Sequence, residues 1–181
     1  DHEECQEILT TYNVDKVKLP AVLIHLGDTV LCNPNNFELA TALGLVEDLK
    51  TDHTYEVTVV GAGPAGLSAA VYAASEGRDT VVLESIAPGG QAGTSSKIEN
   101  YLGFPTGVSG QALAGRAQVQ AMKFGATLAL PNTVKKLTPK DDHFELDLCN
   151  GSILKTKTIV AATGARYRKL DLDNANDFDN A

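Results

Sequence analysis

The chain alternates short apolar runs with polar turns, and two of the runs are typical of buried strands. Residues 57–60 are apolar and mostly β-branched, as in a strand covered on both faces of a parallel sheet. An alanine-rich helix is predicted to follow, ending near Glu76 and stopped by Gly77. Residues 80–84 form a second apolar run that ends in an acid, Glu84. The pattern therefore predicts a strand, a helix and a parallel strand in succession, which is an α/β arrangement.

The turn between the first strand and the helix carries glycines at a spacing that suits a phosphate group. Gly61 permits a tight turn, Gly63 has no side chain to keep a pyrophosphate away, and Gly66 lets the helix lie close to the strand. Pro64 falls in the first helical turn, where its missing N–H has no intrahelical partner anyway. Since a helix N-terminus carries partial positive charge, this turn is predicted to bind an anion.

The acid at the end of the second strand indicates which anion. Glu84 follows Gly66 by roughly the 20 positions at which a carboxylate reaches the adenosine ribose of a dinucleotide. A carboxylate there favours a free 2′-hydroxyl and repels a 2′-phosphate. We therefore expect FAD or NAD, not NADP. A merely structural glycine turn is the alternative, and the matching order of strand, glycines, helix, strand and acid makes it the weaker interpretation.

The region after the acid departs from a compact NAD domain. Residues 88–105 are rich in glycines, hydroxyls and amides, where a second crossover helix would ordinarily begin. Loops of that length inside a domain tend to be functional. Residues 158–164 then read as a buried strand ending in Thr163 and Gly164, at the carboxyl edge of the sheet where ligands bind.

Four motifs together resemble the low-molecular-weight thioredoxin reductase family. They are GAGPAG at 61–66, GGQ at 89–91, IENY with GFP at 98–105, and ATGA at 162–165. They occur in the family's order with similar spacing, and the resemblance covers roughly residues 55–170. Alkyl hydroperoxide reductase flavoprotein subunits and ferredoxin reductases of the thioredoxin reductase type are similar over the same stretch. The resemblance implies FAD as the cofactor, and a Rossmann-like α/β FAD-binding domain with a three-stranded antiparallel insertion, present here as its N-terminal segment.

The resemblance also implies roles for individual residues. The turn glycines would face the pyrophosphate, Glu84 the ribose, and Gly90 and Gln91 the ribityl and pyrophosphate region. Asn100 and Ser96 match polar residues near the flavin ring. A loop-stabilising side chain is the alternative for Gln91, Asn100 and Ser96. Val134 would offer its backbone to the adenine, with a plain core position as the alternative. The implied cofactor-binding residues are Gly61, Gly63, Pro64, Ala65, Gly66, Glu84, Gly90, Gln91, Ser96, Asn100, Val134, Ala162, Thr163 and Gly164.

The N-terminal residues form a separate module. Residues 19–32 read as two strands joined by a turn, and residues 36–43 as a capped helix. This resembles the second half of a thioredoxin or glutaredoxin fold, in which Pro20 would be cis and border the redox site. An unrelated αβ extension is the alternative. We expect a partial module over residues 1–46, cut at its front, a linker over 47–54, and the FAD-domain segment over 55–181.

Two further patterns lie inside the FAD-domain segment. Residues 109–124 have helical spacing, with an apolar stripe from Leu113 to Phe124 that is predicted to face the core. Residues 134–155 read as short strands around the turn at Asn150 and Gly151, a strong hairpin signal. A third parallel strand is predicted to start after this hairpin.

Composition limits the partners of the chain. With 15 Lys and Arg against 23 Asp and Glu, the net charge is −8, which argues against sequence-independent binding to nucleic acid. No run approaches the roughly 20 apolar residues of a membrane span, and no signal-like segment opens the chain. We expect no membrane partner and a cytoplasmic location.

The cysteines and histidines suggest no reactive centre within these residues. Cys5, Cys32 and Cys149 are far apart in sequence, so no CxxC dithiol exists, and the four histidines are scattered. No catalytic residue and no metal ligand is therefore assigned.

The resemblance implies that electrons pass from NADPH through FAD to a disulfide, with NADPH bound outside this segment. The partner would be a thioredoxin-like protein or the chain's own thioredoxin-like module, and the intact enzyme would be a homodimer. One alternative is a reductase without a dithiol that serves a ferredoxin-like acceptor. The other is a non-catalytic module that senses FAD or NAD. A CxxC beyond residue 181 would support the disulfide reductase.

Overall fold

The computed structural model describes residues 2–15, 19–24, 28–46, 49–50 and 52–165. Its main body is a six-stranded mixed sheet with strand order β5-β4-β3-β8-β7-β6. The strands are β3 (Thr54–Val60), β4 (Thr80–Leu83), β5 (Thr127–Ala129), β6 (Val134–Pro139), β7 (Phe144–Leu148) and β8 (Ile153–Ala161). Strands β5, β4, β3 and β8 run parallel to one another, and β6, β7 and β8 are antiparallel.

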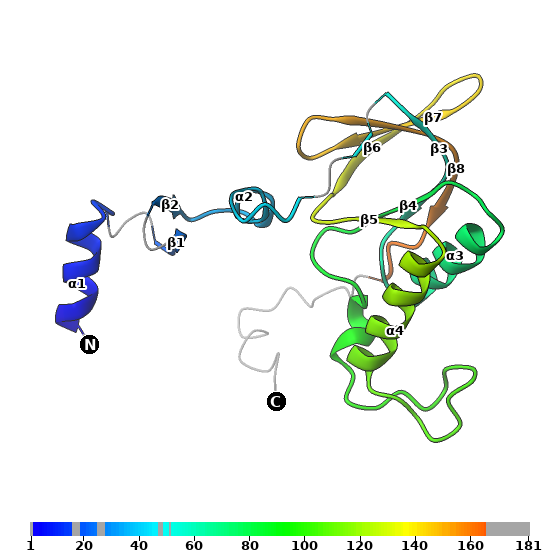
Figure 1. Cartoon of the computed structure of the whole chain (residues 1–181), viewed down its shortest axis with the longest axis horizontal. Coiled ribbons are helices and arrows are strands. Elements are labelled where there is room, and N and C mark those ends of the chain that lie inside the picture. The colour runs from blue at the N-terminus through cyan, green and yellow to red at the C-terminus, as the bar shows by residue number, and fades with distance from the viewer. Residues whose placement is uncertain (1, 16–18, 25–27, 47–48, 51, 166–181) are drawn as a thin grey trace, which may run out of the picture.

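Two helices cover one face of the parallel strands. They are α3 (Pro64–Ser75) and α4 (Gly110–Lys123), which lie together on the side of the sheet away from β6 and β7 (Figure 1). Val59 and Val82 from the sheet pack with Leu67 of α3 and Ala121 of α4, and all four are buried. The expected strand, helix and strand are confirmed, and together they make a Rossmann-like core.

The antiparallel strands pack against the opposite face. Leu146 and Leu148 of β7 form a second buried cluster with Val81 and Leu83 of β4. The parallel part of the sheet therefore lies between a helical layer and the antiparallel ribbon of β6 and β7. Strands β3 and β4 are covered on both faces. This explains why their sequences are apolar without alternation.

Strand β8 differs from its predicted form. The sequence suggested a hairpin strand ending at Lys155 and a separate parallel strand from Thr158. The structure has one continuous strand, in which residues 153–156 pair with β7 and residues 155–161 pair with β3. Leu154 and Thr156 are buried there, and Leu154 packs in the same cluster as Leu146 and Leu148 of β7. The three strands of the expected antiparallel insertion are therefore β6, β7 and the first half of β8.

The apolar stripe of α4 is confirmed except at its end. Leu113 and Ala121 are buried, and Ala117 packs against the same core. Phe124 is exposed, contrary to the prediction, because it is the C-cap residue and lies beyond the last helical turn. Ser109 caps the start of α4 by accepting a hydrogen bond from the N–H of Ala112 at 3.2 Å.

The N-terminal module contains α1 (His2–Thr11), the hairpin of β1 (Ala21–Ile24) and β2 (Thr29–Cys32), and α2 (Asn36–Ala42). The strands and helix expected here are present, although the turn before Thr29 falls partly outside the described residues. The Leu19–Pro20 peptide bond is cis. Identification of this module as half of a thioredoxin fold stays a prediction.

Candidate functional site

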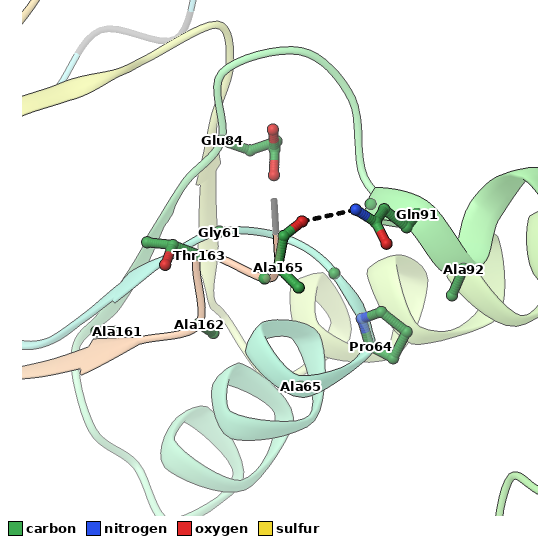
Figure 2. A pocket seen from close by; sticks show the side chains of 13 residues that line it. Gly61, Pro64, Ala65, Glu84, Gln91, Ala92, Ala161, Ala162, Thr163 and Ala165 are labelled. Atoms are coloured by element: carbon green, nitrogen blue, oxygen red, sulfur yellow. Dashed lines mark hydrogen bonds between the residues drawn. The ribbon is translucent and has the colours of Figure 1, made fainter. Parts of the chain in front are cut away.

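The carboxyl edge of the parallel strands holds a cavity of about 400 Å³. Gly61 follows β3, Glu84 follows β4 and Ala162 follows β8, so parallel pairing brings three distant segments together. Figure 2 shows Glu84, Gln91 and Pro64 around the same space. The cavity is lined by Gly61, Gly63, Pro64, Ala65, Glu84, Gly90, Gln91, Ala92, Ala161, Ala162, Thr163, Gly164 and Ala165.

Two glycines of the turn are required by the fold itself. Gly61 has φ +104°, and a Cβ there would lie 2.4 Å from the carbonyl oxygen of Ala162. A Cβ on Gly66 would lie 1.9 Å from the carbonyl oxygen of Gly61. Any side chain at these positions would push apart β3, β8 and α3. Their predicted structural roles, the tight turn and the close helix, are confirmed.

Gly63 is different, because a side chain built on it would meet no protein atom. It is the N-cap of α3 with φ −70°, a conformation open to any residue, and no atom lies within 4 Å of a Cβ built there. The fold does not explain this glycine. Its open side faces the cavity at the first turn of α3, where unpaired N–H groups favour an anion.

Glu84 lies at the cavity and is held by backbone groups. Its Oε2 accepts a hydrogen bond from the N–H of Ala62 at 2.8 Å. Its Oε1 accepts from the N–H of Ser85 at 2.8 Å and from the N–H of Ile86 at 3.0 Å. These bonds fix the carboxylate between the glycine turn and the loop after β4. The Ser85 hydroxyl also donates to Oε1 at 3.1 Å. Oε2 accepts only the bond from Ala62, so one of its lone pairs is left for a ligand.

The loop after β4 closes another side of the cavity. Residues Gly90–Thr94 form the short 3-10 helix η3, and the side-chain N–H of Gln91 donates to the carbonyl of Ala165 at 2.6 Å (Figure 2). This bond joins the loop to the segment after β8. Gly110 lets α4 approach η3, since a Cβ on it would lie 1.7 Å from the carbonyl oxygen of Ala92.

Ten of the predicted site residues line this cavity and four do not. Gly66 is buried in α3, Ser96 and Asn100 are exposed on the loop before α4, and Val134 begins β6 and packs against the core. Three lining residues were not predicted: Ala92, Ala161 and Ala165. Only their adjacency to the GGQ and ATGA motifs could have indicated them, because an alanine carries no chemical signal.

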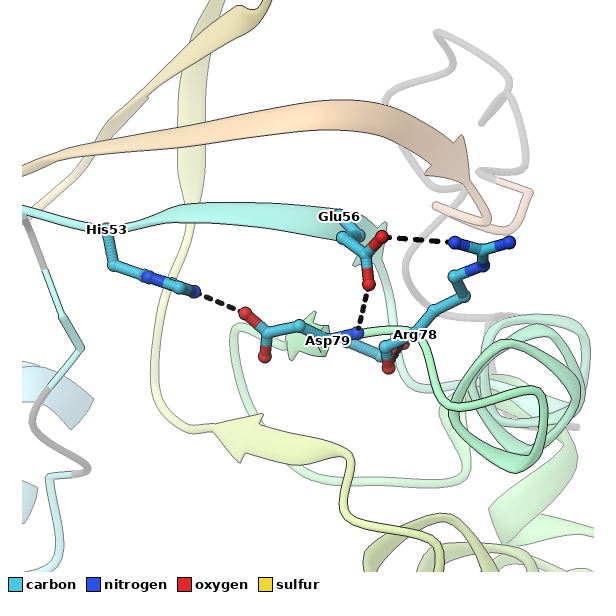
Figure 3. Close-up of polar contacts among 5 residues, drawn as sticks. His53, Glu56, Arg78 and Asp79 are labelled. Carbon is cyan, nitrogen blue, oxygen red and sulfur yellow. Dashed lines mark hydrogen bonds and ion pairs between the residues drawn. The ribbon is translucent and has the colours of Figure 1, made fainter.

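The opposite edge of the same strands carries a cluster of charged side chains (Figure 3). The side chain of His53 contacts Asp79, while Glu56 accepts from the N–H of Asp79 at 3.0 Å and from Arg78 at 3.2 Å. The hydrogen bond from the Asp79 backbone, followed by that from Arg78, lowers the pKa of Glu56. The cluster is exposed and its charges are mutually paired, so it ties the start of β3 to the start of β4.

Two other carboxylates have lowered pKa values, and both lie on the antiparallel ribbon. A hydrogen bond with His143 lowers the pKa of Asp142. A hydrogen bond from Lys140 lowers the pKa of Glu145. Neither group lines the cavity at the carboxyl edge, so we assign them no role in the site.

Within the described residues, no group of three or more His, Cys, Asp or Glu side chains could hold a metal ion. Among the described residues, no helix is long and apolar enough to cross a bilayer.

Comparisons with known proteins agree with this geometry. The model of the family described as pyridine nucleotide-disulphide oxidoreductase matches residues 55–181. A thioredoxin reductase of Treponema pallidum is 38% identical over 130 residues, covering 72% of this chain and 41% of that protein. An NADH dehydrogenase of Bacillus subtilis is 38% identical over 127 residues, covering 70% of this chain and 24% of that protein.

Solved structures give the same result. The crystal structure of a Lactococcus lactis thioredoxin reductase superposes with a TM-score of 0.62 at 33% identity, covering 66% of this chain and 38% of that one. The chain thus spans about two fifths of the length of the thioredoxin reductases that it matches. With its Rossmann-like core and the glycine turn before α3, the chain belongs to the pyridine nucleotide-disulphide oxidoreductase family and is similar to thioredoxin reductases.

Proposed function

We propose that residues 55–181 form the FAD-binding part of a thioredoxin reductase-like enzyme. The observation that carries this proposal is Gly63, whose open side faces a cavity at the start of α3 and which the fold does not require. Glu84, in the same cavity, supplies an acid for a ribose hydroxyl. Both features occur together in the fingerprint of a dinucleotide site.

The residues of the cavity fit FAD. The pyrophosphate would lie against Gly63 and the first turn of α3, where no side chain interferes. Glu84 would accept from the adenosine ribose, and the segment 162–164 would close over the cofactor. Gln91 supports this arrangement by holding the GGQ loop to Ala165. For Ser96 and Asn100 we propose positions near the flavin ring, and for Val134 a backbone contact to the adenine.

In the intact protein, FAD would accept two electrons from a nicotinamide and pass them to a disulfide. The residues described here bind and orient the cofactor and contribute no acid, base or nucleophile. NADPH would bind outside this segment. We propose a thioredoxin-like protein as the partner, or the chain's own N-terminal module, and a cytoplasmic location.

The test is the absorbance of the purified intact protein. We expect a flavin spectrum that NADPH bleaches under anaerobic conditions and that a thioredoxin-type disulfide restores. A colourless protein that binds NAD tightly would contradict the FAD assignment. A flavoprotein that NADPH fails to bleach would instead support the sensing module.

A reductase without a dithiol remains the second candidate. Of the cysteines whose side chains the structure describes, Cys32 and Cys149 are free, and one relative carries the name NADH dehydrogenase. If the bleached protein transfers electrons to a ferredoxin-like acceptor or a quinone but leaves a thioredoxin disulfide oxidised, this candidate is supported.

We also propose that the intact enzyme is a homodimer, and that α3 and α4 contribute to its interface. Tyr72 of α3 is 74% exposed and Phe124 is 44% exposed. Both line a groove of about 360 Å³ with Tyr101 and Phe104. Because exposed apolar surface of this kind often marks an interface, Tyr72→Glu should shift the protein from dimer to monomer in sedimentation. An unchanged dimer would exclude this face.

A further inference from the structure

A second cavity, of about 620 Å³, is formed jointly by the N-terminal module and the FAD-domain segment. One wall comes from the start of α2. The other comes from the loop after β4, the segment between β5 and β6, and the end of β7. Its lining residues are Asn35, Asn36, Phe37 and Glu38 on the first wall, and Ser85, Ile86, Pro131, Thr133 and Cys149 on the second.

Consecutive residues of the loop after β4 line the proposed FAD cavity and this second cavity. Glu84 lines the first cavity, and the next two residues, Ser85 and Ile86, line the second. Their N–H groups hold the Glu84 carboxylate. The part of a dinucleotide that lies beyond a ribose bound at Glu84 is therefore directed toward the second cavity. In FAD that part is the adenine.

A buried polar side chain without a protein partner lies beside this cavity. Asn132, between the lining residues Pro131 and Thr133, is 2% exposed. Its backbone N–H donates to the carbonyl of Glu84 at 2.7 Å. Among the described residues, neither its side-chain Nδ2 nor its Oδ1 has a hydrogen-bond partner. Its side chain is not among those that line the cavity, so this wall is formed by its neighbours Pro131 and Thr133.

The wall from the N-terminal module is locally well defined. The side chain of Asn35 accepts from the N–H of Glu38 at 3.0 Å, and the carboxylate of Glu38 accepts from the N–H of Asn35 at 2.9 Å. This capping box fixes the first turn of α2 and thereby the half-buried Phe37. The aromatic surface of Phe37 and the apolar side chain of Ile86 suit a flat base, which gains from aromatic contact.

We propose that residues 35–38 of the N-terminal module form the outer wall of the adenine subsite. This inference rests on the proposed FAD function. It gives the N-terminal module a role in holding the cofactor, separate from any redox role.

The probe is ADP, which carries the adenosine half of FAD and no flavin, titrated calorimetrically into the whole chain. The variant Phe37→Ala should weaken ADP binding at least about fivefold, the lower end of what stacking on a base contributes. Leu43→Ala is the matched control, because Leu43 is exposed at the other end of the same helix and outside the cavity. It should bind ADP as the wild type does.

A second measurement covers the case in which Phe37→Ala does not fold. In an Asn36→Cys variant, a short bismaleimide should link position 36 to Cys149, and ADP should slow the reaction. The control carries Cys149→Ser as well and should give no such link.

The outcomes separate the two proposals. A wild-type chain that binds FAD and ADP, with Phe37→Ala unaffected and no link to Cys149, overturns the adenine-wall inference alone. A chain that binds neither FAD nor ADP overturns the FAD function and this inference with it.

Discussion

The amino edge and the carboxyl edge of β3 and β4 use the same type of contact for different purposes. At each edge a glutamate accepts hydrogen bonds from neighbouring backbone N–H groups, Glu84 from Ala62 at the carboxyl edge and Glu56 from Asp79 at the amino edge. Glu56 also pairs with Arg78, whereas Glu84 forms no salt bridge with any described residue and faces a cavity. A carboxylate that the protein orients but does not neutralise is available to a ligand.

The largest expected effect concerns the glycine that packs α3 against the carboxyl edge. Gly66→Ala should lower the free energy of unfolding by about 3 kcal/mol, because its Cβ would meet backbone that cannot move aside. The measurement is denaturant unfolding.

Gly115→Ala is the control for that variant. Gly115 is exposed in α4 with nothing within 4 Å of a built Cβ, so alanine should stabilise the chain by about 0.5–1 kcal/mol. If both variants unfolded like the wild type, the close packing of α3 at this edge would be disproved.

A smaller effect is expected from removing the carboxylate at the carboxyl edge. Glu84→Ala leaves the N–H groups of Ala62, Ser85 and Ile86 without their acceptor, and should cost about 2 kcal/mol of unfolding free energy. FAD affinity should fall at least about tenfold, since a ribose acceptor is lost. Glu84→Gln should lie between the two proteins in both measurements. Unchanged FAD affinity in Glu84→Ala would remove this residue from the site.

The smallest effect is expected at the amino edge. The pKa of Glu56 is lowered in the folded chain from a reference of 4.5, so its ionised form stabilises the fold above that pH, and the contribution is lost as pH falls through the lowered value. Glu56→Gln should therefore melt slightly below the wild type at pH 7, and the difference should disappear in acid. Because the group is exposed, the effect should also shrink in salt. A difference that grew on acidification would contradict this assignment, and FAD affinity should not change at all.

The sequence predicted those parts of the fold in which local pattern and long-range packing agree. The turn from Gly61 to Gly66 was predictable because its first and last glycines each answer a local steric need. Strand β5 was not predicted, since three residues ending in Ala129 carry too little periodicity. The continuity of β8 depends on having neighbours on both sides, which no local window contains.

Most of the candidate site was also predictable, since ten of the fourteen predicted residues line the cavity. Glu84 and Gln91 stand at motif positions, and the structure brings both to one cavity. The second cavity has no sequence signal, because it arises where the start of α2 meets segments far away in the sequence. Ser96 and Asn100 are exposed on their loop, and their proposed contacts depend on where the flavin ring lies.

The central claim is that the carboxyl edge of the parallel strands is a binding site for FAD. It is tested most directly by titrating FAD into the wild type, Gly63→Ala and Gly115→Ala while following flavin fluorescence. Gly63→Ala should unfold like the wild type, because its Cβ meets no protein atom, yet bind FAD at least about tenfold more weakly. Gly115→Ala should bind normally. Equal FAD affinity in all three proteins would contradict the claim, since the space beside Gly63 would then not belong to the cofactor.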